Sequence, residues 1–256
     1  MNYEKFYIKT RNIQKPYDGR IDPFKITGNV YFVGTYQASS HLIDTGDGLI
    51  LLDTGYANTV YLVLESIWEL GFDPRDIKYI IHSHWHWDHT EGTEYIANLS
   101  GAKTVIGEHD KDYVVEHGYF VPDITVADGD TLTLGNTTIK FMHTPGHTKG
   151  TVSFFFDTED NGKTYRVGQF GGAGVNSLVK SFATYYDGCR DDYIKSVDRL
   201  ANEKVDVFIG NHCWNNQTEK KAEILKQGKE NPFINENEWT DFLGFCREVW
   251  KTLPAE

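Results

Sequence analysis

The chain has 256 residues, enough for one or two domains with a sizeable hydrophobic core. Its 37 acidic and 25 basic side chains give a formal net charge of −12, which disfavours nucleic acid or an anionic membrane surface as a partner. Hydrophobic residues make up 39% and aromatic residues 14%, so the chain is globular rather than disordered, and no apolar run is long enough to span a membrane.

The first elements along the chain are short runs of β-branched, aromatic and aliphatic residues. Residues 28–34, 38–44 and 48–53 predict a meander of strands separated by turn-forming residues. An amphipathic helix follows, with Gly71 as a natural C-cap, and residues 78–81 then predict a buried strand that leads into a histidine-rich loop. The residues expected to face inward on this helix are Val60, Val63, Leu64, Ile67 and Trp68.

The second half of the chain repeats this order of strands and helices. Strands are expected at 103–107, 131–143, 151–157 and 164–169, and the turn Asp160-Asn161-Gly162 joins the last two as a hairpin. A helix at 190–203, a strand at 205–210 and a C-terminal helix from about Asn237 complete the chain. Because no linker or compositional break interrupts it, we expect a single α/β domain over residues 1–256, with two packed sheets and helices outside.

Three cysteines, Cys189, Cys213 and Cys246, are widely spaced and odd in number, so they form no disulfide framework and are expected to be buried as small hydrophobes. One pair could bridge if the protein is exported. The first eleven residues lack the apolar stretch of a signal peptide, which predicts a cytoplasmic protein. A periplasmic or secreted protein whose signal had been trimmed would read the same.

The ten histidines are distributed unevenly. Residues 81–90 read IHSHWHWDHT, which places four imidazoles and one carboxylate within eight positions directly after a predicted strand. In an extended or tightly turned segment, His84 and His86 point to one side and can bind one cation, whereas the adjacent Asp88 and His89 diverge and can bind a second. Imidazole and carboxylate together suit Zn²⁺, and the same set can bind iron or manganese.

A metal site explains this cluster better than a set of core histidines does. Without a metal, protonated rings would repel one another and Asp88 would lose its hydration uncompensated. The remaining histidines have no ligand spacing, and core or surface positions are the simpler interpretation, although two of them, His82 and His143, are also plausible supports for a ligand. These residues are His41, His82, His109, His117 and His143.

Four segments resemble the metallo-β-lactamase superfamily: LLDTG at 51–55, HWHWDH at 84–89, TPGHTKGTVSF at 144–154 and an isolated histidine at 212. The resemblance covers most of the chain and implies a four-layer αββα sandwich of two half-domains. Asp53 falls at the family's buried aspartate, where it either orients a ligand or simply makes a turn. The resemblance implies one zinc held by His84, His86 and His147, and a second zinc held by Asp88, His89 and His212.

The segment between the last two histidine ligands separates the subgroups of this superfamily. Glyoxalase-II-like hydrolases, lactonases and RNA-processing nucleases usually place a metal-bridging aspartate there, and two β-lactamase subclasses place a cysteine. Here Gly171 and Gly172 stand at that position, which resembles the third β-lactamase subclass, although that subclass usually has a small polar residue at Gly172. Stretches at 22–44, 157–167 and 231–234 agree with the same subclass.

These features predict a binuclear zinc-dependent hydrolase that cleaves a β-lactam or similar cyclic amide through a metal-bridging hydroxide, with Asp88 orienting the nucleophile or moving its proton. Two Zn²⁺, one carboxylate and one hydroxide leave a site charge of about +2, which favours a small anionic substrate. One alternative is a lactone, thioester or phosphodiester hydrolase on the same scaffold. A non-catalytic metal-binding protein is another. No nucleic-acid or membrane partner is expected, and the oligomeric state is left open.

Overall fold

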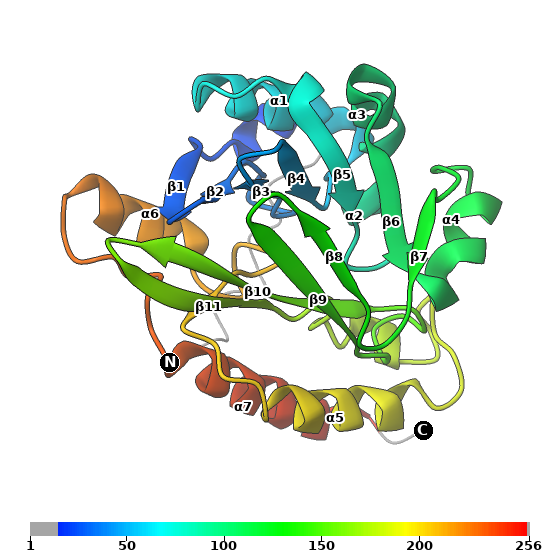
Figure 1. The fold of residues 1–256 in the computed structure, drawn as a ribbon. Coiled ribbons are helices and arrows are strands. Elements are labelled where there is room, and N and C mark those ends of the chain that lie inside the picture. The colour runs from blue at the N-terminus through cyan, green and yellow to red at the C-terminus, as the bar shows by residue number, and fades with distance from the viewer. Residues whose placement is uncertain (1–14, 255–256) are drawn as a thin grey trace.

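A computed structural model describes residues 15–254, so the N-terminal segment on which the expectation about a signal peptide rests lies outside the described residues. Two β-sheets pack face to face, with helices on both outer surfaces (Figure 1). This is the α/β sandwich that the sequence predicts. Among the residues described, no helix is long and apolar enough to cross a membrane.

The N-terminal half forms a seven-stranded sheet whose strands lie in chain order from β1 to β7. The first four strands pair antiparallel, and β4 to β7 pair parallel. Parallel neighbours end at the same edge of a sheet, so the residues that follow β4, β5 and β6 meet there. The strands are β1 (Phe24–Thr27), β2 (Val30–Phe32), β3 (His41–Asp44), β4 (Leu49–Leu52), β5 (Ile77–Ile81), β6 (Lys103–Gly107) and β7 (Ile124–Val126).

The second sheet has five strands in the order β12-β11-β10-β9-β8. Because β10 runs antiparallel to both β9 and β11, and β12 runs parallel to β11, the ends of β9, β11 and β12 also lie at one edge. The histidines that follow β9 and β12 therefore lie near each other. The strands are β8 (Thr131–Leu134), β9 (Thr137–His143), β10 (Val152–Asp160), β11 (Lys163–Gln169) and β12 (Val207–Phe208).

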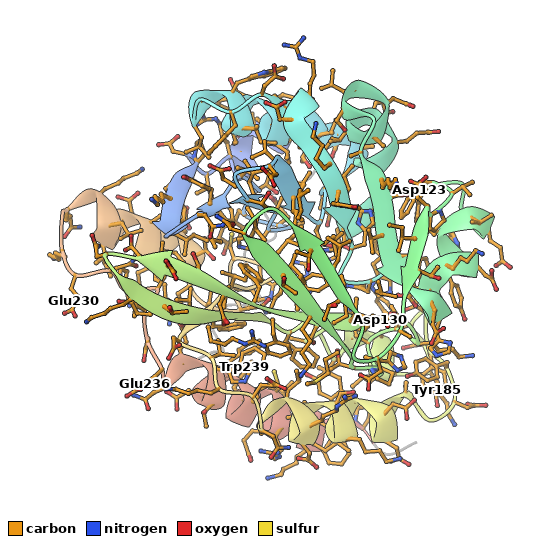
Figure 2. All side chains as sticks on the ribbon, in the orientation of Figure 1. Asp123, Asp130, Tyr185, Glu230, Glu236 and Trp239 are labelled. Carbon is orange, nitrogen blue, oxygen red and sulfur yellow. The ribbon has the colours of Figure 1, made fainter. Side chains whose placement is uncertain are left out.

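Three apolar clusters hold the four layers together. The central one lies between the sheets and includes Phe32 and Phe141, and a second joins the outer face of the seven-stranded sheet to α1 and α3. The third joins the five-stranded sheet to α5 and α7, where Trp239 is buried against the sheet (Figure 2). The helices are α1 (Val60–Glu69), α2 (Trp87–Thr90), α3 (Thr93–Ser100), α4 (Lys111–Glu116), α5 (Cys189–Leu200), α6 (Thr218–Lys226) and α7 (Glu238–Lys251).

Several elements differ in detail from the sequence prediction. The single strand expected at 131–143 is a hairpin, because Gly135 adopts φ +50° and reverses the chain between β8 and β9. Trp68 is 56% exposed rather than buried, because the inward stripe of α1 runs through Leu62 and Ser66 instead. All three cysteines are free and buried, as the sequence predicts.

Candidate metal centre

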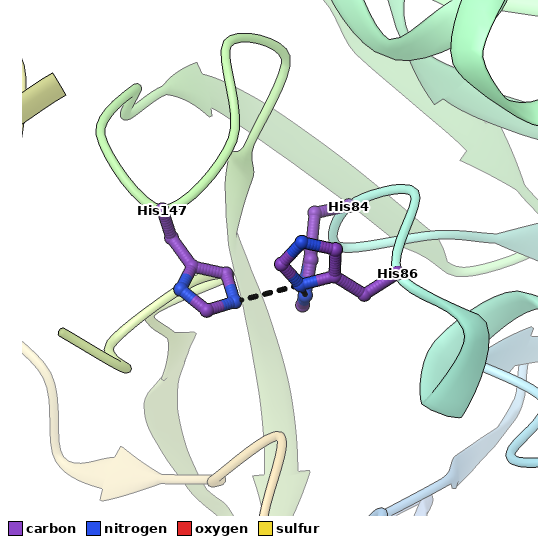
Figure 3. A group of neighbouring side chains, drawn as sticks. All are labelled: His84, His86 and His147. Atoms are coloured by element: carbon purple, nitrogen blue, oxygen red, sulfur yellow. Dashed lines mark hydrogen bonds between the residues drawn. The ribbon is translucent and has the colours of Figure 1, made fainter. Parts of the chain in front are cut away.

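The histidine-rich segment leaves the end of β5 and turns into the short helix α2. Two of its histidines, His84 and His86, meet His147, which lies on the loop between β9 and β10 (Figure 3). The Nδ1 atom of His86 lies 3.1 Å from His84 Nε2 and 3.0 Å from His147 Nε2. We refer to these three buried residues as the first cluster.

Asp88, His89 and His212 form the second cluster, with one candidate ligand atom from each within 4.8 Å of the others. One carboxylate oxygen of Asp88 lies 3.5 Å from His89 Nε2 and 3.7 Å from His212 Nε2. The side chain of His89 is fully buried, whereas those of Asp88 and His212 are 15% and 17% exposed. The structure thus brings all six predicted residues into the two groups of three that the sequence predicts.

Hydrogen bonds at the far side of three rings fix which nitrogen carries the proton. His147 Nδ1 donates to the carbonyl of Gly174 at 2.7 Å, and His89 Nδ1 donates to the Asp53 carboxylate at 2.9 Å. His212 Nδ1 likewise donates to the carbonyl of Gln37. Each ring therefore presents an Nε2 lone pair to its cluster, which is the state that metal ligation needs.

Two further observations fit a bound metal. His89 Nε2 is buried and has no hydrogen-bond partner, an arrangement that is costly for an imidazole lone pair unless an ion accepts it. In a tetrahedral zinc site with bonds of ~2.0–2.1 Å, ligand nitrogens lie roughly 3.3 Å apart. The nitrogen separations of 3.0 and 3.1 Å in the first cluster are close to that spacing. The donor set suits zinc, and these side chains fit the ion.

Burial favours the neutral form of four of the five cluster imidazoles; in His89 burial is outweighed by the carboxylates of Asp88 and Asp53, which raise the pKa of the ring. It lowers the pKa of His147 and of His212 to about 4. Burial, reinforced by the neighbouring imidazoles, also lowers the pKa of His84 and His86 well below the usual value. Because a metal binds neutral imidazole, these rings need not lose a proton at neutral pH before they ligate.

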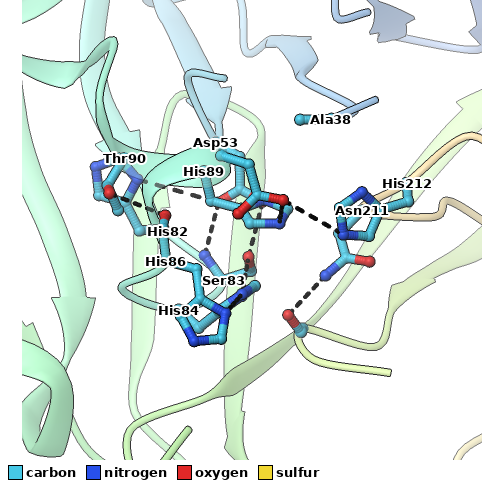
Figure 4. A network of polar contacts seen from close by, with 12 residues as sticks. Ala38, Asp53, His82, Ser83, His84, His86, His89, Thr90, Asn211 and His212 are labelled. Atoms are coloured by element: carbon cyan, nitrogen blue, oxygen red, sulfur yellow. Dashed lines mark hydrogen bonds and ion pairs between the residues drawn. The ribbon is translucent and has the colours of Figure 1, made fainter. Parts of the chain in front are cut away.

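Asp53 lies beside His89 and Ser83, close to histidines of both clusters (Figure 4). It follows β4 directly and adopts φ +56°, a left-handed conformation uncommon outside glycine, which turns the chain sharply at this point. Its carboxylate accepts hydrogen bonds from the backbone N–H and the hydroxyl of Ser83, both at 2.8 Å, as well as from His89. The Ser83 hydroxyl in turn lies 3.0 Å from His84 Nδ1. Asp53 therefore both makes the turn and supports one histidine of each cluster.

Sequence reasoning missed Asp110, which follows β6 at the same edge. This fully buried carboxyl accepts hydrogen bonds from the backbone N–H of Trp85, the hydroxyl of Thr148 and the backbone N–H of Gly150. It thereby ties the loop of His84 and His86 to the loop of His147, and burial raises its pKa to about 7. Its place just past a predicted strand is the signal that could have found it.

The tryptophans around the clusters have different roles. Trp85 is buried and stacks on Tyr113 with ring centroids 5.1 Å apart. Trp87, which opens α2, is 38% exposed and lines the pocket. Trp214, which the sequence analysis did not single out, stacks on His212 with centroids 4.3 Å apart and an interplanar angle of 9°.

The segment after β11 approaches the first cluster too closely for a side chain. A Cβ added to Gly172 would lie 2.6 Å from the Cβ of His147, and one added to Gly171 would lie 2.0 Å from the carbonyl oxygen of Val152. These glycines thus let the backbone pass beside the ligands. In the described part of the chain, residues 165–177 supply no carboxylate or thiolate to either cluster.

A pocket of about 280 Å³ opens beside both clusters. The residues that line it include no lysine or arginine, and Asp88 is the one carboxylate among them. Such a pocket admits a small molecule. Its lining consists of His86, Trp87, Asp88, His147, Ala173, Gly174, Val175, Asn176, Phe182, His212, Trp214, Asn215, Phe242, Phe245, Cys246 and Val249.

The other histidines lie outside both clusters. His41 and His82 are buried, and burial lowers the pKa of each to about 4. His82 Nε2 lies 3.1 Å from the Thr93 hydroxyl. The ring of His143 lies 2.7 Å from the carbonyl of Lys149. The interpretation of these residues as ordinary core and surface histidines agrees with their positions.

Comparison with known proteins adds an independent line of evidence. Residues 33–212 match the profile of the metallo-beta-lactamase superfamily. The structure of BJP-1, a subclass B3 metallo-beta-lactamase of Bradyrhizobium japonicum, superposes with a TM-score of 0.86 and 32% identity, covering 93% of this chain and 95% of that one. LRA-12, a class B3 di-zinc metallo-beta-lactamase from an Alaskan soil metagenome, gives a TM-score of 0.82 at 26% identity, covering 95% and 97%.

Curated relatives match over a shorter part of their length. A hydroxyacylglutathione hydrolase of Pelagibacter ubique is 35% identical over 157 residues, which is 60% of this chain and 59% of the relative. The chain spans about half to three-fifths of the length of three of the curated relatives it matches, and a smaller share of others. The similarity in sequence therefore extends to proteins with different named activities.

Proposed function

The chain belongs to the metallo-β-lactamase superfamily, and we propose that it is a single-domain, two-zinc hydrolase that cleaves a β-lactam or a similar cyclic amide. The observation that carries this proposal is the pair of three-residue clusters at one pocket, each with ligand atoms within 4.8 Å of one another. The similarity to subclass B3 metallo-beta-lactamases over more than nine-tenths of the chain supports it.

The residues divide into two sets of ligands. His84, His86 and His147 would hold one ion, and Asp88, His89 and His212 the other. Bound there, two zinc ions would lower the pKa of a shared water to near neutrality and polarise the substrate carbonyl. Iron or manganese could bind the same donors.

Asp88 is the residue that we assign to catalysis. It is the one carboxylate in the pocket lining, and its partial exposure leaves it in contact with the pocket. From this position it can orient the attacking water and accept its proton, in addition to its role as a ligand. No pocket-lining serine or threonine competes for the role of nucleophile, and Cys246 is a poor candidate because burial raises the pKa of its thiol to about 12.

We further propose that the substrate is small and anionic. Since no lysine or arginine lines the pocket, attraction for an anion would come from the bound ions and from the amides of Asn176 and Asn215. The whole chain carries a net charge of −12, so a positive field at the pocket would contrast with the negative charge of the protein as a whole.

A lactone, thioester or phosphodiester hydrolase is the second candidate. The 35% identity with a hydroxyacylglutathione hydrolase favours it. Gly171 and Gly172 count against it, because a bridging aspartate would need side-chain room that their surroundings do not leave.

Metal analysis combined with a substrate panel tests the proposal. We expect two zinc ions per chain, hydrolysis of at least one of a penicillin, a cephalosporin and a carbapenem, loss of that activity with EDTA, and no effect of serine-directed inhibitors. Rapid cleavage of lactones or thioesters by the zinc-loaded protein, with all three lactams untouched, would overturn the lactam assignment and leave the second candidate.

A further inference from the structure

The pocket has two chemically different ends. One end is formed by residues of the two clusters. The other end is lined by residues of the C-terminal helix α7, which contains none of the six candidate ligands. We propose that the second end, here called the apolar end, is a subsite for an uncharged, apolar substituent of the substrate. The term substrate rests on the proposed function, whereas the subsite itself rests on the lining. The apolar end is lined by Val175, Phe182, Phe242, Phe245, Cys246 and Val249.

One wall of the apolar end is a stripe along α7. Phe242, Phe245, Cys246 and Val249 follow one another at i, i+3, i+4 and i+7, so they share one face of the helix. Phe242 packs on Phe208 of β12 with ring centroids 4.7 Å apart. This wall is therefore backed by the hydrophobic core of the five-stranded sheet and is held in place.

A second wall belongs to the segment between β11 and α5. Phe182 lies 6.3 Å from the ring of His86, measured between centroids, and the Thr184 hydroxyl lies 3.0 Å from His86 Nε2. The segment that lines the apolar end thus also supports a residue of the first cluster. A group bound between these walls would be adjacent to the scissile bond rather than at a remote surface.

The lining determines which substituent fits. A charged group would lose its hydration without a counter-charge, because no residue of the apolar end is ionised at neutral pH. An aromatic or branched aliphatic group would instead be stabilised by burial. The volume of about 280 Å³ for the whole pocket is small for a ligand site, so we expect one ring rather than a long chain.

A pair of zinc-binding thiols that share a head group separates binding at the apolar end from hydrolysis. The probes are mercaptoacetate and 2-mercapto-3-phenylpropanoate, titrated calorimetrically into the zinc-loaded protein. We expect the phenyl compound to bind at least about tenfold more tightly, which corresponds to ~1.4 kcal/mol. Val249→Trp, which fills the apolar end, should reduce this preference to less than about threefold, since burial of the phenyl ring is its source.

Glu248→Trp is the matched control, because it places the same ring on the neighbouring residue of α7, whose side chain is 69% exposed. It should keep the full preference. Phe245→Ala provides a second variant should Val249→Trp fold poorly, and it should weaken the preference severalfold by removing one wall. The proposal of a subsite would be overturned if the unmodified protein bound both thiols equally well or bound neither of them. An unchanged preference in both pocket variants would overturn it as well.

The results of the lactam hydrolysis assays are interpreted separately from the thiol titration. A phenyl preference that Val249→Trp removes, in a protein that cleaves no lactam, would leave the subsite intact and refute the proposed function. Lactam hydrolysis without any phenyl preference would do the reverse.

Discussion

The first and second clusters differ in their surroundings more than in their donors. The first consists of three buried imidazoles, each bonded on its far side to a different part of the chain: Ser83, Thr184 and Gly174. The second contains a carboxylate, and Asp88 and His212 remain partly exposed to the pocket. Enclosed, well-supported ligands favour retention of an ion, whereas partly exposed ligands favour exchange and contact with substrate.

The largest expected effect follows removal of a residue from the first cluster. His84→Ala or His147→Ala should abolish binding of the first metal ion and reduce the rate of hydrolysis by about a thousandfold or more. A site with only three protein ligands is not expected to retain its ion when one of them is removed. Metal content per chain and steady-state rates measure this. His109→Ala, at an exposed histidine outside both clusters, is the control. Full metal content in either cluster variant would contradict the ligand assignment.

Chelation should distinguish the two clusters in the unmodified protein. Since Gly171 and Gly172 supply no further ligand, the second ion depends on three protein groups and solvent. We therefore expect it to dissociate at a lower chelator concentration, and Asp88→Ala, His89→Ala and His212→Ala to deplete it selectively. A titration with a single affinity for both ions, or an Asp88→Ala protein that retains both, would remove the difference between the clusters.

Acid should destabilise the metal-free protein. His41, His82, His147 and His212 have folded pKa values of about 4, against about 6.5 for an unperturbed histidine, so between these values the unfolded chain binds protons that the folded chain does not. Their stabilisation is complete above pH 6.5 and is lost as the pH falls towards 4. Asp110, with its pKa raised to about 7, and His89 and Glu238, whose pKa values are also raised, act in the opposite direction but are fewer.

Denaturant unfolding of the metal-free protein at pH 7.0 and 5.0 measures this effect. We expect a clearly lower free energy of unfolding at pH 5.0, and a smaller drop in the zinc-loaded protein as long as the ions stay bound. Equal or greater stability at pH 5.0 would mean that the buried rings are not held neutral.

Two supporting residues sharpen the comparison with smaller effects. Asp110→Asn should weaken binding of the first ion by about tenfold, because Asp110 ties together the two loops of the first cluster. Trp214→Leu should weaken binding of the second ion severalfold, because it removes the ring stacked on His212. Competition with a fluorescent zinc chelator gives both affinities.

Matched controls are available for both changes. Asp112→Asn and Trp68→Leu replace an exposed residue of the same type and should leave both affinities unchanged. If Asp110→Asn affected only the second ion, or Trp214→Leu only the first, the division of supports between the clusters would be wrong.

Much of the site follows from the sequence, because each ligand lies just past a strand and strand ends converge at one edge. The same patterns did not locate the supports. Asp110 acts by joining two loops that are far from each other in the chain. Hydrophobic periodicity gives information only about residues within one helix or strand, so it cannot reveal such a contact. Trp85 and Trp87 have equivalent spacing in the motif, and only the start of α2 at Trp87 separates the buried ring from the exposed one. In α1, apolar residues occupy more than one face of the helix, so their spacing did not identify the inward face. This is why Trp68 was wrongly expected to be buried.

The shared carboxylate of Asp53 makes the two clusters parts of one equilibrium. It bonds directly to His89 and, through Ser83, reaches His84. An ion that fixes one of these rings also fixes Asp53, and so orders the other ring in advance. Reciprocity then requires that each ion change the affinity for its neighbour by the same factor, so the order in which the two ions leave is set by the difference between the clusters and not by this link.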